Sequence, residues 1–435
     1  MKKQLLFLTC MAVLFGCAKE NLPQRPDAAI AVGQAKSRFL TLDSIQQLAA
    51  ELPECFGEGA LTRSGYTKSV ADLFPLNDIL RSSATKSGET DDAEVTKNIY
   101  VVNYADDGGF AILAADTLME TILAYSDQGN ITDTMDNPGV RMFMEMIPGY
   151  AAAQLAHDPG WDSMSMEDKY PAQSEILLRR EYTQVGPFVP VRWNQTEPFN
   201  EGINWPDMFT CNNTSNGKPV AGCVAIAMLN IMAANSYPTS FQVSNGWYTC
   251  YWDNWRSYLY GSWFPADSYD RRAIAALVAE IGSAVDMSYG CSSSSSSTSK
   301  ADKAFKNRFN YLTDGIYSFN ADRVRMELYY KRAIYVGGYA TENWIGYSHG
   351  HDWVIDGYKD VYRVWGVYNN FYDENYNLIR QEPAGERKEQ ETRWLHCNYG
   401  WGGTGNGYYY VGVFNTEFPV ELDPNCAKPS NYYYY

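Results

Sequence analysis

The segment 222–234, GCVAIAMLNIMAA, predicts a helix that is apolar on nearly every side and is therefore buried nearly all round. Its residues Val224, Met228 and Ile231 recur at helical spacing on one face, and three further apolar side chains widen that face. A second, amphipathic helix is predicted at 269–285. Strand-like segments follow, at 333–339, 351–358, 361–368, 394–399 and 407–413. Helices followed by strands indicate an α+β fold with an antiparallel sheet.

The length of 435 residues indicates at least two folding units, because a single hydrophobic core rarely grows beyond about 250 residues. In the first unit, apolar and β-branched runs at 98–104 and 110–115 are joined by Asp and Gly turn residues, which predicts a β-hairpin. A helix is predicted over 137–155, with a kink or break at Pro148. The front of the chain thus has the composition of a folded module.

The first residues indicate export. Lys2 and Lys3 precede an apolar run at 5–15 that is too short for a membrane-spanning helix of about 20 residues but typical of a secretory signal. The sequence LFGC, which ends at Cys17, resembles a lipobox, so we expect Cys17 to carry a lipid; simple cleavage near Ala18 is the alternative. We therefore expect an outer-membrane or cell-surface lipoprotein precursor, held to the membrane only through this lipid and secreted after processing.

Charge and cysteine spacing limit the partners and cofactors. The chain carries 35 Lys and Arg against 51 Asp and Glu, a formal net charge of -16, so nucleic acid is not expected as a partner. Nine cysteines are present, two of them in the signal, and they lack the paired CxxC spacing of zinc sites; we expect no metal and no other cofactor. The cysteines outside the signal are odd in number, which indicates that one of them keeps a free thiol for chemistry. These cysteines are Cys55, Cys211, Cys223, Cys250, Cys291, Cys397 and Cys426.

Cys223 stands at the first turn of the predicted helix 222–234, directly after Gly222. Unpaired backbone N–H groups and the positive end of the helix dipole stabilise a thiolate there and lower the thiol pKa. Gly222 has no side chain to block the approach of a substrate to the sulfur. Without further context, a cysteine that starts an apolar helix is more often a small buried hydrophobic residue, so a nucleophile needs a partner histidine.

Three histidines lie in the second module, and His351 is the best candidate for a general base. It heads the apolar strand pattern of GHDWVIDGY, so a sheet can hold its ring rigidly, and Gly350 leaves room beside it. We expect His349 to be a loop residue. His396 precedes the glycine- and aromatic-rich turn NYGWGG, whose Asn398 can orient an imidazole as the third group of a Cys-His-Asn arrangement.

Six motifs follow one another along the chain. IYVVNYADDGGFAILAADTLMETILAYSDQGNI begins at Ile99, WNQTEPFN at Trp193 and AGCVAIAMLNIM at Ala221. SAVDMSYG with the serine-rich loop after it begins at Ser283, GHDWVIDGY at 350 and NYGWGGTGNGYY at 398. Together they resemble the streptopain family of papain-like cysteine peptidases, which are secreted or lipid-anchored bacterial proteases. The first motif resembles the inhibitory propeptide of that family.

The resemblance implies a papain-like catalytic domain, with a helical part and an antiparallel sheet, preceded by an α+β propeptide domain. The implied catalytic residues, with Gln195 in the oxyanion hole, are Cys223, His351, Asn398 and Gln195. The implied substrate-binding residues are Ser292, Ser293, Ser294, Gly350 and Trp401; read from composition alone, the serine run is a flexible surface loop. Two features depart from the family: Tyr399 replaces a usual tryptophan, and the long interval 358–396 is expected to be a surface insertion.

The expected organisation is a lipoprotein-type signal peptide at 1–17, a linker at 18–35, an inhibitory propeptide at 36–180 and a cysteine peptidase domain at 181–435. We expect the activating cut between about 170 and 185, with Arg180–Glu181 the favoured bond, because polar and flexible segments are the preferred sites of nicking.

The expected function is that of a secreted cysteine endopeptidase made as a zymogen. It would hydrolyse protein or peptide substrates through a thiolate–imidazolium pair and an acyl-enzyme thioester. Its own propeptide would inhibit it, and an activating protease would be a further partner. Two other classes stay open: a catalytically silent surface binding protein, and another thiol acyl transferase or amidase on the same scaffold.

Overall fold

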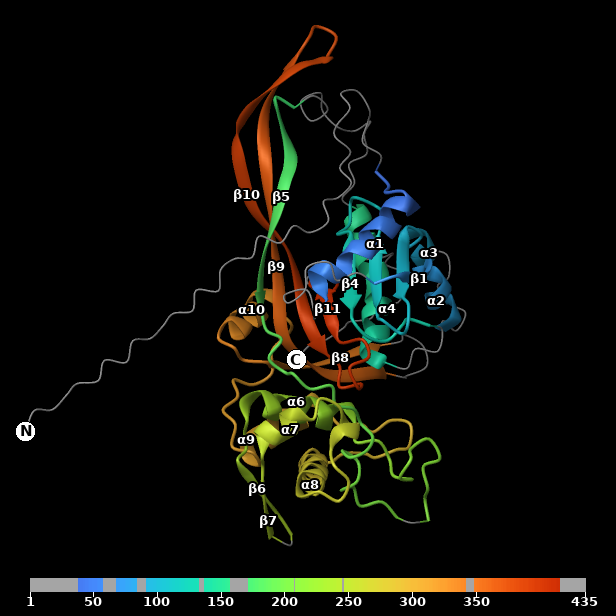
Figure 1. Cartoon of the computed structure of the whole chain (residues 1–435), viewed down its shortest axis with the longest axis vertical. Coiled ribbons are helices and arrows are strands. Elements are labelled where there is room, and N and C mark those ends of the chain that lie inside the picture. The colour runs from blue at the N-terminus through green and yellow to red at the C-terminus, as the bar shows by residue number, and fades with distance from the viewer. Residues whose placement is uncertain are drawn as a thin grey trace, which may run out of the picture.

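The computed structural model describes residues 38–57, 68–83, 91–132, 137–156, 171–206, 208–244, 246–341 and 348–414 (Figure 1). The expected signal peptide with Cys17, the linker, the polar stretch 157–170 and Cys426 lie outside the described residues. Within the described part of the chain, no helix is long and apolar enough to cross a membrane.

The described part of the first module combines four helices with four strands. The helices are α1 (Leu42–Phe56), α2 (Leu76–Ser83), α3 (Asp91–Val95) and α4 (Pro138–Ala156), and the strands are β1 (Val70–Pro75), β2 (Ile99–Tyr104), β3 (Phe110–Ala114) and β4 (Ile122–Ser126). Helix α1 begins after Thr41, whose hydroxyl oxygen accepts a hydrogen bond of 3.2 Å from the Ser44 backbone N–H. Its face with Ile45, Leu48 and Leu52 is buried, as the helical spacing of these residues requires.

The predicted hairpin is confirmed, and the predicted break in the following helix is wrong. Ile99 of β2 pairs with Ala114 of β3, and Asp106 and Asp107 in the turn adopt the positive φ angles that Asp tolerates. Helix α4 continues through Pro148, which lies inside it and is buried. A proline removes one helical hydrogen bond, and the tertiary packing of α4 offsets that loss.

The second module begins with helices and ends with strands, so the predicted α+β class is confirmed. Its helical elements are α6 (Cys223–Asn235), α7 (Trp252–Ser257), a 3-10 turn (Gly261–Trp263), α8 (Tyr269–Ala284), α9 (Thr298–Asn307) and α10 (Ala321–Tyr329). Its strands are β5 (Gln173–Val185), β6 (Ser240–Val243), β7 (Gly246–Thr249), β8 (Ile334–Thr341), β9 (Ser348–Tyr372), β10 (Leu378–Asn398) and β11 (Gly407–Tyr410). The predicted helices 222–234 and 269–285 correspond to α6 and α8 within one residue at each end.

Both modules contribute strands to one antiparallel sheet. Its order is β1-β2-β3-β4-β11-β10-β9-β5, and β8 pairs with β9 off this path. The junction is the pairing of β4 with β11, where Tyr125 lies opposite Tyr408. A single core cluster contains Phe143 of α4 together with Trp353 and Tyr409 of the second module. In this structure the two modules therefore share one sheet and one core cluster.

Strands β9 and β10 form a long hairpin that projects away from both modules, with β5 along its edge (Figure 1). Two separate strands were expected at 351–358 and 361–368, and this is wrong because β9 is continuous across both. The predicted insertion at 358–396 is this hairpin. Strand β9 pairs with β10 on one side and with β5 on the other, so the extension is a three-stranded sheet along the length of β5.

The segment expected to be flexible and open to cleavage is a strand. Arg180 pairs with Arg363 in the ladder between β5 and β9, so the bond Arg180–Glu181 lies inside a sheet. Glu175 of β5 also accepts hydrogen bonds of 2.7 Å from Arg387 of β10. A protease binds an extended and unpaired chain, so the sheet disfavours a cut at this bond until β5 unpairs.

One disulfide joins Cys211 to Cys291 across a sequence separation of 80 residues. Four described cysteines lie outside this disulfide: Cys55, Cys223, Cys250 and Cys397. The odd number of cysteines therefore does not single out Cys223, and the argument from parity is wrong. The position of Cys223 in the fold has to identify it instead.

Candidate active site

Cys223 is the first residue of α6, as predicted, and it is partly exposed. The preceding Gly222 has a φ of 93°, a left-handed conformation that favours glycine. A Cβ at Gly222 would also lie 3.0 Å from the Met287 side chain and 3.2 Å from Cβ of Ser294. Gly222 thus allows both the sharp entry into the helix and the close packing beneath the sulfur.

Gln195 lies against the backbone that leads into Cys223. Its Oε1 accepts a hydrogen bond of 3.1 Å from the Gly222 N–H, and its carbonyl oxygen accepts one of 2.8 Å from the Ala221 N–H. The side chain is 7% exposed. The structure therefore brings together two of the four predicted catalytic residues, Gln195 and Cys223.

The partner of the Cys223 sulfur is Asp352. The thiol donates to Oδ2 of Asp352 over 3.9 Å, while Oδ1 of Asp352 accepts hydrogen bonds from the Tyr335 hydroxyl at 2.7 Å and the Thr298 hydroxyl at 3.0 Å. Burial and then the neighbouring Asp352 carboxylate raise the pKa of Cys223 to about 12. The start of the helix alone favours a thiolate, so the predicted lowering of the thiol pKa is outweighed in this structure.

His351 lies in β9 and is 1% exposed. Its Nε2 donates a hydrogen bond of 2.9 Å to the Tyr399 carbonyl, and its buried Nδ1 has no hydrogen-bond partner within the described residues. Burial lowers the pKa of His351 to about 4. Because a carbonyl only accepts, a proton lies on Nε2, and since the lowered pKa favours the neutral ring, Nδ1 is left as a bare acceptor.

The structure does not pair His351 with Cys223. His351 and Asp352 are consecutive in β9, opposite Gly338 and Gly337 of β8, so their side chains point to opposite faces of the sheet. The His351 ring contacts Trp353, Tyr399 and Trp401, with centroid distances of 6.3, 6.0 and 6.2 Å. Asp352 occupies the face toward the sulfur. The predicted catalytic pair is therefore not assembled in this conformation.

Asn398 does not reach the His351 ring either. Its Nδ2 donates to the Val191 carbonyl at 2.8 Å, and its Oδ1 accepts from the Gly400 N–H at 3.1 Å. The amide fixes the turn NYGWGG, while the backbone carbonyl of the next residue, Tyr399, holds the imidazole. Asn398 thus lies next to the residue that holds the ring, and its direct hydrogen bond to the ring stays a prediction.

The other two histidines of the second module, His396 and His349, both lie in strands. His396 lies 5% exposed in β10, and its Nδ1 is 2.6 Å from Oδ1 of the fully buried Asp356. The other carboxylate oxygen of Asp356 accepts from the Val189 N–H at 2.8 Å, which ties the chain after β5 to the base of the hairpin. His349 was expected in a loop, and this is wrong because it lies in β9 opposite Ala340.

The predicted substrate-binding residues divide into two groups. Ser294 is 5% exposed beneath Gly222, and its hydroxyl donates to the Val220 carbonyl at 2.6 Å, so the view of the serine run as a flexible surface loop is wrong there. Trp401 packs edge-on against His351, which places it at the site. The others are exposed at the surface: Ser292, Ser293 and Gly350.

The group around Asp352 was not predicted from the sequence. Asp352 was visible as the residue after the predicted base, and the two-residue period of a strand places it on the opposite face from His351. Tyr335 and Thr298, its hydrogen-bond partners, come from β8 and α9, and no local signal links them to it. The described residues contain no group of three or more His, Cys, Asp or Glu side chains that could hold a metal ion.

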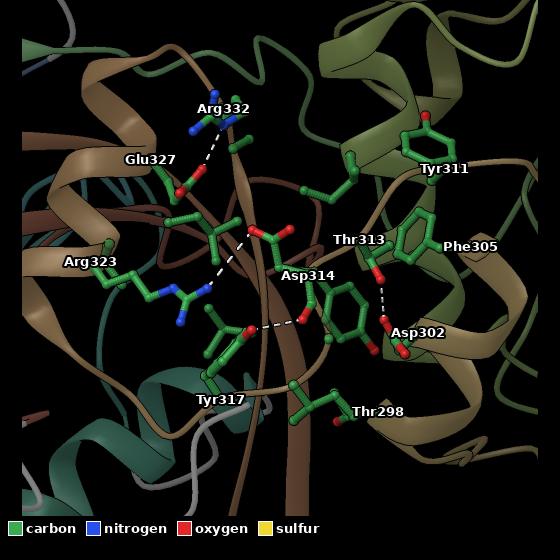
Figure 2. A pocket seen from close by; sticks show the side chains of 18 of the residues that line it. Thr298, Asp302, Phe305, Tyr311, Thr313, Asp314, Tyr317, Arg323, Glu327 and Arg332 are labelled. Atoms are coloured by element: carbon green, nitrogen blue, oxygen red, sulfur yellow. Dashed lines mark hydrogen bonds and ion pairs between the residues drawn. The ribbon is translucent and has the colours of Figure 1, made fainter.

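A cavity of about 340 Å³ adjoins this group (Figure 2). Thr298 and Tyr335 line it, together with the aromatic side chains of Phe305 and Tyr311. Charged residues at its rim pair with one another, for example Arg332 with Glu327 at 2.5 Å. The cavity is thus mainly apolar, and it reaches the hydroxyl groups that hold Asp352.

A cysteine at a helix start, a glutamine against the preceding backbone and a histidine on the adjoining sheet are the residue types that a thiol hydrolase uses. Residues 193–409 match the Peptidase C10 family, and residues 63–149 match the Spi protease inhibitor family. The two matches together cover more than half of the sequence. This chain belongs to the Peptidase C10 family and is a cysteine peptidase with an inhibitor-type domain in front of it.

Curated relatives agree with this assignment. Streptopain of Streptococcus pyogenes is 25% identical over 381 residues, covering 78% of this chain and 82% of the relative. The thiol protease/hemagglutinin PrtT of Porphyromonas gingivalis is 23% identical over 394 residues, covering 82% of this chain and 39% of that protein. Among solved structures, a fragment of Prevotella intermedia prointerpain A is similar with a TM-score of 0.48 at 18% identity, covering 78% of this chain and 95% of that one.

Proposed function

We propose that this protein is an endopeptidase made as a latent precursor, with Cys223 as the nucleophile and His351 as the general base. The observation that carries the proposal is the seating of Cys223 at the start of α6 with Gln195 bonded to the Gly222 N–H. This contact supports a site in which the Gln195 side-chain amide and the Cys223 backbone N–H would serve as donors beside the sulfur. Such donors stabilise the oxyanion of acyl transfer by about 3 kcal/mol each.

In the active form, His351 would take the proton from the Cys223 sulfur, and the thiolate would attack the carbonyl carbon of the scissile peptide bond. The imidazolium would then give its proton to the leaving amine, so that the C–N bond breaks and a thioester remains on the sulfur. Water would hydrolyse the thioester, releasing the second product and restoring the thiol. Neither step requires an oxidant or a cofactor.

Latency is supported by the contacts of the first module around His351. A Cβ at Gly139 of α4 would lie 2.1 Å from the Tyr399 ring, so this helix packs closely against the residue whose carbonyl holds the imidazole. Met142 of α4 also contacts the position of Gly338, which lies opposite His351 in the sheet. While α4 is in place, it favours the conformation in which the base faces away from Cys223.

We expect the form freed of its first module to hydrolyse an unfolded protein faster than the precursor by about 10²–10⁴, which is the usual contribution of a general base. The measurement is the appearance of new N-termini in unfolded casein, with the Cys223→Ala precursor processed in parallel as the control. Equal rates for precursor and processed form would contradict latency. Consumption of substrate without new N-termini would indicate a different thiol acyl transfer.

We also propose that the precursor is exported and carries a lipid on Cys17, supported by the charged and apolar start of the chain and the sequence LFGC. A labelled fatty acid should enter the wild-type protein in a bacterial host and should be absent from the Cys17→Ala variant. Cys10→Ala is the matched control, since Cys10 lies in the apolar core of the same signal, and should keep the label. An unlabelled wild-type protein recovered in the medium would contradict the anchor.

A further inference from the structure

A buried carboxylate lies beside the nucleophile. Asp352 is 9% exposed, and one of its oxygens lies 3.9 Å from the Cys223 sulfur. The other oxygen is held by the hydroxyl groups of Tyr335 at 2.7 Å and Thr298 at 3.0 Å. Elements α6, β8, β9 and α9 thus converge to place an acidic group against a thiol.

Two acidic groups in contact oppose each other's ionisation, because a thiolate next to a carboxylate brings two negative charges together in a largely buried site. Burial raises the pKa of Asp352 to about 6, so its carboxylate is charged above that pH, in the range where a thiol begins to ionise. The titratable groups that face it are the Cys223 thiol from α6 and the Tyr335 hydroxyl from β8; α9 contributes the hydroxyl of Thr298. Among the described residues, no lysine or arginine acts on Asp352 or Cys223 to offset the repulsion.

We propose that Asp352 is a positioning residue that keeps Cys223 in its protonated thiol form in the precursor, so that the nucleophile stays unreactive. The proposal deepens the proposed function, because it rests on Cys223 as the nucleophile. It adds a second cause of latency to the separation of the base from the sulfur. The precursor is then silent for two reasons that can be tested separately.

Asp352 and His351 exclude each other beside the sulfur. They are consecutive in a strand and lie on opposite faces, so the backbone that presents Asp352 to Cys223 turns His351 away. A change that brought the imidazole to the sulfur would have to remove the carboxylate from it. The same local rearrangement would therefore supply the base and release the thiol from its negative neighbour.

The test measures how fast iodoacetamide alkylates Cys223 in the full-length precursor between pH 6 and pH 10, read at the Cys223 peptide by mass spectrometry. Only the thiolate reacts, so the rate reports its fraction. In Asp352→Asn the negative neighbour is lost, so at pH 8 alkylation should be about tenfold faster, equivalent to one pKa unit. The matched control is Asp302→Asn, which changes a carboxylate of α9 that bonds Thr313 and Lys306, and it should react like the wild type.

A second variant guards against misfolding of Asp352→Asn. Tyr335→Phe keeps the carboxylate but removes one hydrogen bond that stabilises its charged form, so Asp352 should hold its proton to a higher pH. Alkylation near pH 7 should then rise, by less than in Asp352→Asn. An unchanged pH profile in both variants, or an equal rise in Asp302→Asn, would overturn the proposal. Alkylation reports ionisation whether or not the protein cleaves peptides, so failure here is distinct from failure of the proposed function.

Discussion

Replacing Cys223 with alanine should lower peptide-bond hydrolysis by the processed enzyme by at least about 10⁴, because no other group can form the thioester. The fold should persist. Alanine favours the helix, the left-handed Gly222 and its hydrogen bond to Gln195 remain, and the lost contact is a long one of 3.9 Å. The measurements are the rate of casein hydrolysis and the thermal unfolding of the purified variant.

Cys250→Ala is the control for this prediction. Cys250 is another free thiol of the second module, 7% exposed, and burial raises its pKa to about 12. It lies in the core of the helical part and contributes packing alone, so its loss should lower stability modestly and leave the rate per folded molecule intact. Full activity in Cys223→Ala, or loss of activity in Cys250→Ala, would show that the nucleophile is misassigned.

Replacing His351 with alanine should lower the rate of the processed enzyme by about 10²–10⁴, since the proton of the sulfur then has no acceptor and the leaving amine has no donor. The effect should fall on kcat and vary with pH less than the wild-type rate does. In the precursor, where the ring is buried and bonded to the Tyr399 carbonyl, the same change should have no effect on the already low activity.

His396 and His349 provide the comparison. His396→Ala leaves the fully buried Asp356 without its partner at 2.6 Å, so it should lower the unfolding free energy by several kcal/mol and reduce the amount of folded protein. Its rate per folded molecule should stay close to the wild-type value. If His349→Ala were the change that removed activity, the strand position assigned to the base would be wrong by two residues.

The parts of this protein that local sequence predicts are those whose partners lie nearby. The apolar pattern of α6, the amphipathic pattern of α8 and the hairpin of β2 and β3 were predicted because each repeats within a few residues. Cys223 at a helix start was predicted from the apolar helix pattern and Gln195 from the resemblance to the streptopain family, and the structure brings the two residues together. Pro148 failed as a break because tertiary packing outweighs the cost of a proline in a helix.

The rest of the fold depends on pairing between segments that lie far apart in the sequence. The joining of β4 to β11, the capture of β5 by β9 and the disulfide between Cys211 and Cys291 link segments far apart in sequence, and many alternative partners have the same local pattern.

The active site shows most clearly which features the local sequence predicts and which depend on the packed sheet. Sequence placed a histidine and an aspartate side by side in one strand, and either could have faced the sulfur. The register of β9 against β8 turned Asp352 toward Cys223 and His351 away from it, because side chains alternate between the faces of a sheet and only the packed sheet sets which face each one takes.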